Sequence, residues 1–445
     1  MWKIFTISID RLKCSEITQN IATLSIGSVI SQFIPIVMSF VLSRLYSVEN
    51  YGDFSIFINY AGIIAVFSSF RYEYAIVRPR KEVDALNLFA LSGIIALATS
   101  FLLWMVLLLS DLFQIAAINS IPLKYWLPIY TISIALVQIF NNYANRIERY
   151  RTITFSAITK SVSQAITRIC FGFFHYGPGL IIGSTFGLIS SCSIFFRKIP
   201  VWHSLMRSFS WKRMCSLAKT YTNFPKYVLP SGLLNTMSTN LPVILLAYFY
   251  TKDNIGHFSM AISILYLPIT VIGNALGQIF YKKASSWEKD ETNTLAKQFL
   301  TLSAIIGLFI FVVLFLGGEQ LFSFLLGENW ALVGRYATFL SPWLISVLCL
   351  SPLGWIFDAR DKQKTEMYIN VFMFCSRIFI ILLGGFLHLE FGTTLILYSL
   401  ISLILWLIEG SFIYKILEIQ FSRSQKIIIS SYICLILLGW IVRIW

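Results

Sequence analysis

Residues 86–109 read LNLFALSGIIALATSFLLWMVLLL, a run of 24 residues without an Asp, Glu, Lys or Arg. As a helix this run is about 36 Å long at 1.5 Å per residue, which exceeds the roughly 30 Å hydrocarbon layer of a bilayer. Similar runs recur between short polar breaks, and we expect twelve membrane-spanning helices at residues 21–42, 54–70, 86–109, 124–143, 155–174, 178–196, 227–250, 258–280, 299–316, 335–357, 368–388 and 392–414. A shorter thirteenth candidate at 427–442 suits a span, an interfacial helix or a re-entrant segment.

The composition of the whole chain agrees with this pattern. Of 445 residues, 57% are hydrophobic and 13% are charged, and the mean hydropathy is +0.74. Soluble domains carry about 25% charged residues, so the composition excludes a soluble enzyme. The predicted fold class is an all-α polytopic membrane protein with two six-helix bundles, twelve transmembrane helices and the thirteenth C-terminal candidate.

The net charge of +14, from 35 Lys and Arg against 21 Asp and Glu, mainly reports orientation. Basic residues resist translocation and stay on the cytoplasmic side of a membrane. With the N-terminus in the cytoplasm, 27 basic residues lie in cytoplasmic segments and three, Arg44, Lys252 and Arg443, lie in outer segments. The sequence therefore predicts a cytoplasmic N-terminus, and its charge does not call for a nucleic acid as a partner.

The longest cytoplasmic loop divides the chain. We expect a cytoplasmic N-terminus at 1–20, a first six-helix bundle at 21–197, a linker at 198–226, a second bundle at 227–414 and a C-terminal segment at 415–445. The linker is basic and carries apolar residues at roughly helical spacing. It is either an amphipathic helix on the inner leaflet or a solvated connection.

Two loops repeat one another across this division. YSVENYGDFSI begins at Tyr46 and YTKDNIGHFSM begins at Tyr250, so Tyr, Asn, Gly, Phe and Ser coincide at an offset of 204 residues. The span before each loop contains a proline, Pro35 in the first and Pro242 in the second. Equivalent positions in two six-helix halves favour a duplicated bundle, and a chance match of turn residues is the alternative.

Motifs of several enzyme classes are absent from the sequence. No Gly is followed by Lys, which excludes a P-loop, and there is no G-x-S-x-G, H-E-x-x-H or paired-cysteine metal pattern. We therefore expect a protein that is not an enzyme and that has no catalytic residues, metal site or cofactor. Transport is the default functional class.

Cationic side chains inside spans carry the strongest functional signal. An ionisable residue in a span costs about 2.5–3.5 kcal/mol on insertion scales, so its presence usually marks a substrate path or a buried pair. Arg377 lies near the middle of its span. Lys160, Gln164 and Arg168 follow an i, i+4, i+8 spacing, which places them on one face of a helix. One interpretation is a basic cavity that binds a phosphate or diphosphate, because guanidinium groups match the geometry of phosphate oxygens.

Each cationic residue also has a structural interpretation. Arg377 is suited to pair with a carboxylate such as Glu409 on the following span. Lys160 is suited to extend to the cytoplasmic interface, and Arg168 to the outer one. The sequence leaves both interpretations open.

Two cytoplasmic loops are candidates for the mouth of a cavity. SSFRYEYAIVRPR at 68–80 places Arg71 and Glu73 at the membrane boundary, and NNYANRIERYR at 141–151 contains Asn142 and Arg146. Each loop is either an ordinary basic loop of the cytoplasmic side or an entrance for a charged head group.

Polar residues gather near the prolines of the first and seventh spans. Gln32 lies beside Pro35, and Asn235 and Asn240 precede Pro242. Prolines are tolerated in spans whose freed backbone groups face protein or water. A gating or cavity-wall role is one interpretation, and close helix packing through small residues is the other.

Four sequence features indicate a family. They are SRLYSVENYGDFS at 43–55, RYEYAIV at 71–77, DNIGHFS at 253–259 and the basic Asn-Arg loop after the fourth span. With these motifs the chain resembles the Wzx-type O-antigen flippases, the polysaccharide-transporter branch of the multidrug/oligosaccharidyl-lipid/polysaccharide (MOP) exporter superfamily. The resemblance covers about residues 20–415, and the thirteenth segment departs from the usual twelve spans.

The resemblance implies a MATE-like, V-shaped pair of bundles in the bacterial inner membrane. Such a protein flips an undecaprenyl-diphosphate-linked oligosaccharide from the cytoplasmic to the outer leaflet by alternating access, with a cationic central cavity for the head group. By location, Arg71, Lys160, Arg168 and Arg377 are the corresponding positions in this chain. The resemblance also implies a polymerase and a chain-length regulator as partners, and coupling to protons or sodium.

Two other functions are the alternatives. A multidrug or small-molecule exporter of the same superfamily is expected to place acidic residues in its spans, where only Glu409 is clearly embedded here. A membrane polysaccharide polymerase is expected to have a large outer loop, whereas the longest here is 317–334.

Overall fold

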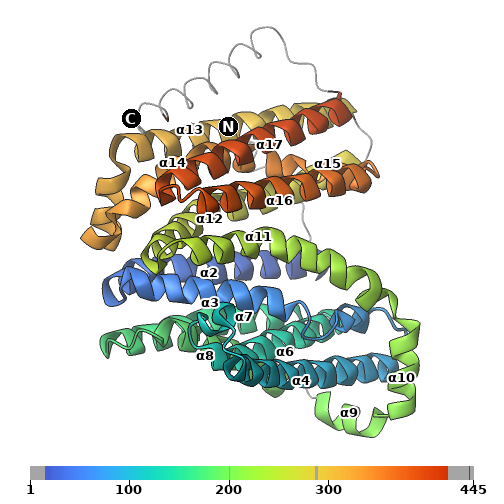
Figure 1. Ribbon diagram of the computed structural model, residues 1–445. Coiled ribbons are helices and arrows are strands. Elements are labelled where there is room, and N and C mark those ends of the chain that lie inside the picture. The colour runs from blue at the N-terminus through green and yellow to red at the C-terminus, as the bar shows by residue number, and fades with distance from the viewer. Residues whose placement is uncertain (1–15, 200, 286–288, 419–439, 441–445) are drawn as a thin grey trace. The chain divides into compact units, whose positions relative to one another are not determined.

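The computed structural model describes residues 16–199, 201–285, 289–418 and Trp440, which form helices joined by short turns (Figure 1). In chain order the elements are α2 (Glu16–Leu45), α3 (Val48–Ala65), η1 (Tyr72–Val77), α4 (Glu82–Leu112), α5 (Ala116–Asn119), η2 (Lys124–Trp126), α6 (Leu127–Arg146), α7 (Tyr150–Phe173), α8 (Gly179–Lys198), α9 (Val201–Ser208), α10 (Trp211–Thr220), η3 (Phe224–Val228), α11 (Leu229–Phe249), α12 (Lys252–Ser285), α13 (Lys289–Leu326), η4 (Glu328–Trp330), α14 (Ala331–Leu350), η5 (Ser351–Leu353), α15 (Ile356–Ala359), α16 (Gln363–Phe386) and α17 (Phe391–Leu417). The all-α fold class is confirmed, and a helix overlaps each of the twelve predicted spans. The thirteenth candidate lies outside the described residues, apart from Trp440.

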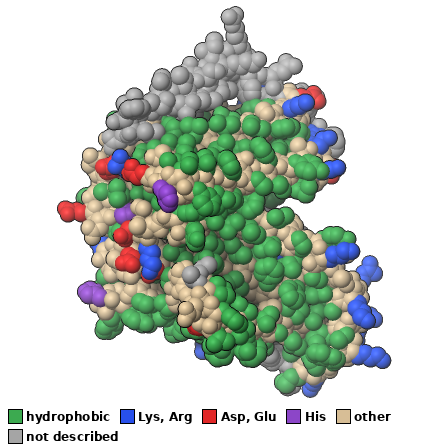
Figure 2. Space-filling model, viewed as in Figure 1, with side chains coloured by type: hydrophobic (Ala, Val, Ile, Leu, Met, Phe, Trp, Pro, Cys, Tyr) green, Lys and Arg blue, Asp and Glu red, His purple; other side chains and the backbone are tan. Residues whose placement is uncertain are grey.

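Many of these helices are long and apolar. Within the described residues, seven are suited by length and composition to cross a membrane: Glu82–Leu112, Gly179–Lys198, Phe224–Phe249, Thr292–Leu326, Glu328–Ala359, Gln363–Phe386 and Phe391–Leu417. Apolar side chains cover the flanks of the long helices (Figure 2). On α4, Phe101 and Leu102 are 65% and 62% exposed, as expected for side chains that face lipid. The chain is a multi-pass membrane protein.

Two predicted spans end earlier as helices than their hydropathy indicates. α3 stops at Ala65, and the following turns lead to Phe70 and Arg71, which have left-handed backbone conformations with φ of 48° and 64°. α14 stops at Leu350, just before Pro352 in the short helix η5. Proline has no N–H to continue the helical hydrogen bonds, and hydropathy alone does not register this change of backbone.

The chain forms two compact units, each described here by itself. The first unit comprises Met1–Tyr46 and Phe57–Asn240. In it α2 packs on α7, α7 on α8, and α6 on α4 and α8. A buried cluster at one end joins η1, α4, α6 and α8 through residues that include Tyr72, Phe89, Phe140, Tyr143 and Phe195. The helices α9 and α10, which occupy the predicted linker, also pack within this unit.

The second unit comprises Ser47–Ile56 and Leu241–Trp445. Its centre is α14, whose side chains are almost all buried between α12, α13 and α17. A further buried cluster joins the short helices η5 and α15 to α12, α13 and α17.

The two repeated loops meet inside the second unit. Gly52 of α3 lies against the backbone of Lys252, and Gly256 of α12 lies against the backbone of Val48, so neither position has room for a Cβ atom. Ser55 Oγ and Ser259 Oγ are 2.5 Å apart. The residues of these contacts correspond at an offset of 204, Gly52 to Gly256, Val48 to Lys252 and Ser55 to Ser259. The residues that coincide in the sequence repeat therefore include those that make this reciprocal contact.

Candidate functional site

The predicted cytoplasmic mouth begins where α3 ends. After the left-handed residues Phe70 and Arg71, the chain forms η1, which places Arg71 at the start of this short helix. The Arg71 guanidinium donates to Tyr74 Oη over 3.1 Å and lies 5.5 Å from the centre of the Tyr74 ring. It is 3.8 Å from the Glu73 carboxylate and lies against Gly232 of α11. Its Nε atom is buried and has no hydrogen-bond partner among the described residues.

Glu73 is the buried member of this pair, with 1% of its side chain exposed. The Ser69 hydroxyl donates to Glu73 Oε2. Burial raises the pKa of the Glu73 carboxyl above its ordinary value, although the Ser69 hydrogen bond and the nearby Arg71 charge oppose that shift. The carboxyl therefore takes up a proton more readily than an exposed glutamate does.

Arg146 stabilises the other end of η1. Its Nη1 donates to the carbonyl oxygens of Ile76 and Val77, at 3.2 Å each. Asn142, one turn earlier on α6, donates to the carbonyl oxygen of Gln138 on its own helix. Of the two predicted residues of this loop, Arg146 thus contacts η1.

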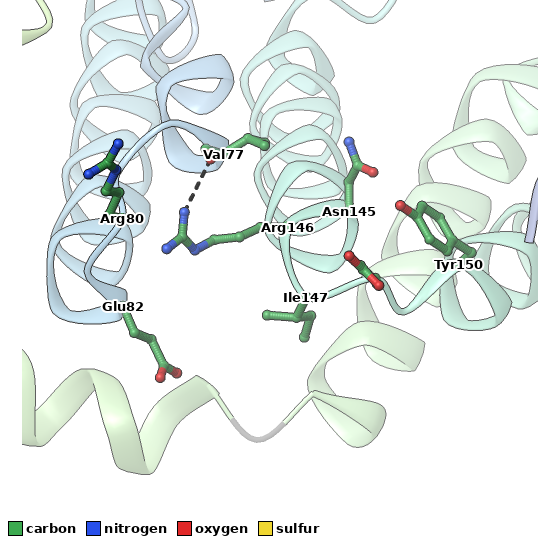
Figure 3. A pocket seen from close by; sticks show the side chains of 8 residues that line it. Val77, Arg80, Glu82, Asn145, Arg146, Ile147 and Tyr150 are labelled. Carbon is green, nitrogen blue, oxygen red and sulfur yellow. Dashed lines mark hydrogen bonds between the residues drawn. The ribbon is translucent and has the colours of Figure 1, made fainter. Parts of the chain in front are cut away.

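A polar pocket of about 520 Å³ opens beside this contact. Its lining comes from η1, the start of α4, the end of α6 and the start of α7, and consists of Val77, Arg80, Glu82, Asn145, Arg146, Ile147, Glu148 and Tyr150. Figure 3 shows Arg146 reaching toward Val77, with Arg80 and Glu82 on one side and Asn145 and Tyr150 on the other. With charges of both signs and neutral polar groups, the pocket has donors and acceptors for a strongly hydrated molecule.

The predicted stripe on α7 is a hydrogen-bonded structure around Arg168. The Arg168 side chain is buried between α7 and α8, where Nε donates to Leu180 O over 3.2 Å and Nη2 donates to Ser184 Oγ over 2.6 Å. The Gln164 amide, with its oxygen turned to the guanidinium, accepts from Nη1 and Nη2 at 3.1 and 2.6 Å. Lys160 lies half-buried one turn further along. The Arg168 guanidinium therefore joins two helices.

Arg377 in the second unit has a different environment. On α16, its Nε donates to Ser402 Oγ of α17 over 3.0 Å, and its guanidinium lies 5.3 Å from the ring centre of Trp343 on α14. Nη2 is buried without a hydrogen-bond partner in the part of the chain that the structure describes. A buried cationic donor with nothing to accept its hydrogen bond is unfavourable unless an anion or a water molecule binds there.

Glu409, the alternative partner of Arg377, lies elsewhere on α17. It is 6% exposed, and its Oε1 lies 3.9 Å from the point where a Cβ atom on Gly354 would be. The described residues include no ion pair between Arg377 and Glu409, and Glu409 Oε2 is also without a hydrogen-bond partner among them. The two charged groups therefore do not neutralise one another by direct contact.

The polar residues beside the prolines lie on α2 and α11. Pro35 and Gln32 are exposed on α2. Asn240 donates to the carbonyl oxygen of Thr236 over 2.8 Å, and Asn235 is exposed on the same helix. Pro242 is buried within α11, in the part of that helix that belongs to the second unit.

The structure thus brings together some of the predicted site residues. Arg71 meets Glu73, and Gln164 meets Arg168, both within the first unit, whereas Arg377 belongs to the second. A single cavity that unites Arg71, Lys160, Arg168 and Arg377 stays a prediction. Sequence reasoning missed the partners Tyr74, Ser184, Ser402 and Trp343, because isolated hydroxyl and aromatic side chains in apolar runs do not indicate which arginine they contact.

Known proteins of similar sequence and structure place these features in context. The model of a family described as "polysaccharide biosynthesis protein" matches residues 41–333. No curated protein sequence matches the chain.

Solved transporters share its fold. An inward-facing multidrug resistance MATE family transporter of the MOP superfamily aligns with a TM-score of 0.62 at 14% identity, over 90% of this chain and 100% of that one. The lipid II flippase MurJ, in an inward closed conformation, also aligns with a TM-score of 0.62, at 16% identity over 94% of this chain and 97% of that one. An outward-facing MATE transporter aligns with a TM-score of 0.54 at 14% identity, over 90% and 95% of the two chains. The expected MATE-like fold is confirmed.

Proposed function

The chain belongs to the polysaccharide biosynthesis protein family, and on that premise we propose that it flips undecaprenyl-diphosphate-linked oligosaccharide repeat units from the cytoplasmic to the outer leaflet. The repeat units then serve the synthesis of a surface polysaccharide such as O-antigen, capsule or exopolysaccharide. One solved protein of the same fold is a lipid II flippase, so the fold is compatible with a lipid-linked substrate.

The proposal rests on the environment of Arg377. Its Nη2 donor is buried and unpartnered among the described residues, inside a helix that is suited to cross a membrane. The cost of inserting such a residue is offset when it binds an anion, and guanidinium groups bind phosphate oxygens through two parallel hydrogen bonds. Ser402 and the Trp343 ring hold the guanidinium in place without neutralising its charge.

The chemistry of the substrate explains why a cation is needed there. A diphosphate cannot enter hydrocarbon without compensation for its charge, whereas a polyprenyl tail is soluble in the bilayer. In our proposal Arg377 binds the diphosphate while the tail stays in the lipid. Arg71 and the polar pocket beside Arg146 receive the charged and hydroxylated head group at the cytoplasmic end. Alternating access then exposes the head group to the outer side.

Deletion and complementation test this function. In the bacterium that carries the gene, we expect deletion to abolish surface polysaccharide and to leave lipid-linked repeat units in the cytoplasmic leaflet. The wild-type gene should restore the polysaccharide. Arg377→Ala should not, Arg377→Lys should restore it in part, and Arg335→Ala, which alters an exposed arginine of the same unit, should restore it fully. Immunoblots of membranes check that each variant is inserted in equal amount.

Two results contradict the proposal in different ways. Full complementation by Arg377→Ala would remove Arg377 from the binding site. Repeat units that accumulate on the outer leaflet of the deletion strain would assign the protein to a later step, such as polymerisation.

A small-molecule exporter is the second candidate. The observation in its favour is Glu409, a buried carboxylate in α17 of the kind that a cationic substrate would pair with. A deletion strain that keeps its polysaccharide but becomes sensitive to organic cations would support this function over flipping.

The remaining predictions belong to the same proposal. We place the protein in the bacterial inner membrane with its N-terminus in the cytoplasm, following the distribution of Lys and Arg. The proposal also includes coupling of transport to protons or sodium. It includes a polymerase and a chain-length regulator as partners. Accumulation of substrate after collapse of one ion gradient, but not the other, identifies the coupling ion.

A further inference from the structure

The segment between α8 and α11 is firmly attached to the first unit. Asn87 of α4 donates to Ser208 O over 2.8 Å and accepts from the Ser210 backbone N–H over 3.0 Å, which holds the corner between α9 and α10. Arg213 pairs with Asp84 at 2.6 Å, and the Tyr72 hydroxyl donates to Ala218 O over 3.0 Å. These contacts tie both helices to the start of α4 and to η1.

The attachment gives this segment two distinct sides. On the inner side Met214 is buried, and Leu205 and Leu217 pack on the cluster shared by η1, α4 and α6. On the outer side, Met206, Phe209 and Trp211 are 70%, 47% and 61% exposed. Large apolar side chains on a well-anchored element normally mark a surface that another molecule covers.

The charge of the segment indicates which kind of molecule that is. From residue 197 to residue 226 the chain has seven Lys and Arg and no Asp or Glu. Arg213 is paired, whereas Arg207, Lys212 and Lys219 are exposed. Figure 2 shows Lys and Arg side chains gathered at this end of the first unit. The surface is therefore suited to an anionic partner.

The location of the segment indicates a membrane surface. Asn87 lies five residues into α4, about 7.5 Å from its first residue, and further along the same helix Phe101 and Leu102 face lipid. Figure 1 shows α10 running across the end of α4 rather than along it. The exposed apolar side chains therefore lie beside a lipid-facing helix, near the depth at which a span meets the head groups. Tryptophan and basic residues are enriched at that depth.

We propose that Met206, Arg207, Phe209, Trp211, Lys212 and Lys219 form a binding surface for the anionic phospholipids of the cytoplasmic leaflet. The three apolar side chains insert between lipids at the level of the glycerol backbone, and the three cations contact the phosphates. This surface is separate from the substrate site, and it does not depend on the proposed function.

Photo-crosslinking of the purified full-length protein tests the proposal. The protein is reconstituted in vesicles that contain phosphatidylglycerol with a diazirine near its glycerol backbone, or the matching phosphatidylcholine, and the adducts are mapped by peptide mass spectrometry. We expect adducts in residues 204–219, at higher yield with phosphatidylglycerol. Equal yields with the two lipids would overturn the recognition of anionic lipids, and this comparison needs no variant.

Two variants and a control separate the contributions. R207Q/K212Q/K219Q should lower the phosphatidylglycerol yield by up to about a hundredfold, since each of the three cations near an anionic surface contributes about fivefold. M206Q/F209Q/W211Q should lower the yield with both lipids. K362Q/K364Q/K415Q removes three exposed cations from the second unit and should leave adducts in 204–219 unchanged.

Other occupants of the surface would give other products. In a separate reaction of the same vesicles with a bifunctional amine-reactive reagent, cross-links that join two copies of the chain through Lys212 or Lys219, with no lipid adducts in 204–219, would assign the surface to self-association. Lipid adducts on the start of α4 with none in 204–219 would place the segment away from the membrane. Either result would overturn the proposal.

Discussion

Arg168 and Arg377 look alike in the sequence and differ in the structure. Each is an arginine deep in a predicted span. Arg168 binds Leu180 O, Ser184 and Gln164, whereas Arg377 has one hydrogen bond, to Ser402, and a buried Nη2 without a partner among the described residues. The comparison teaches that an arginine in the membrane has at least two roles. Arg168 holds two helices together, and in our proposal the unpartnered Nη2 of Arg377 binds a ligand.

The largest expected difference is in stability. Arg168→Met removes the hydrogen bonds from the guanidinium to Leu180 O, Ser184 and Gln164 and should lower the free energy of unfolding by about 3 kcal/mol. Arg377→Met removes one hydrogen bond but also removes a buried unpaired donor, so its effect on stability should be close to zero. Fluorescence-detected size-exclusion chromatography of heated, detergent-solubilised protein measures the apparent melting temperature of each variant. Equal loss of stability in the two variants would end the distinction between the two arginines.

A smaller effect should follow from displacing Arg168 without removing it. A Cβ atom at Gly183 would lie 2.6 Å from Arg168 Cγ, so Gly183→Ala should cost about 1–3 kcal/mol by overpacking the contact between α7 and α8. Gly93 on α4 is the matched control, because nothing lies within 4 Å of a Cβ there. Gly93→Ala should be neutral or should stabilise the helix by up to about 1 kcal/mol. If the Gly183→Ala protein had the same melting temperature as the wild type, the contact of Arg168 with α8 would tolerate displacement.

Arg71 offers the smallest and most specific test, because its neighbour Glu73 is a buried acid outside the spans. The pKa of Glu73 is raised by burial, so above the ordinary value of 4.5 the folded state binds more protons than the unfolded state does. Stability should therefore fall as the pH rises from 4.5 through the raised pKa, and Glu73→Gln should remove this component. The difference in melting temperature between the two proteins, measured from about pH 4 to about pH 8, isolates it. We expect the stability advantage of Glu73→Gln over the wild type to grow as the pH rises. An advantage that instead shrinks as the pH rises would contradict the raised pKa of Glu73.

The sequence was informative wherever one helix decides the outcome. The positions of the twelve helices follow from runs of apolar residues, and the i, i+4 spacing of Gln164 and Arg168 correctly places them on one face of α7. The sequence repeat also identified residues of a real contact, because Gly52, Ser55, Gly256 and Ser259 meet in the second unit.

Contacts between side chains of different helices could not be predicted from the sequence. Ser184 and Ser402 are small polar residues in apolar runs, and nothing in one chain indicates that each contacts an arginine. The same is true of Asn87, which binds the α9–α10 corner 121 residues further along the chain. The structure also shows no direct pairing of Arg377 with Glu409 among the described residues, although adjacent spans made this pairing plausible.

By itself, the sequence determined that this protein lies in a membrane, where its helices run and which polar residues are embedded in them. Hydrophobic burial in lipid and backbone hydrogen bonding within a helix are local to each segment, so composition and spacing suffice for these conclusions. Only the tertiary structure decided which embedded charges are satisfied. That depends on hydrogen-bond partners from other helices, brought within about 3 Å by packing. Because of those partners, the guanidinium of Arg168 is hydrogen-bonded to its neighbours, while Arg377 keeps a buried Nη2 without a partner among the described residues.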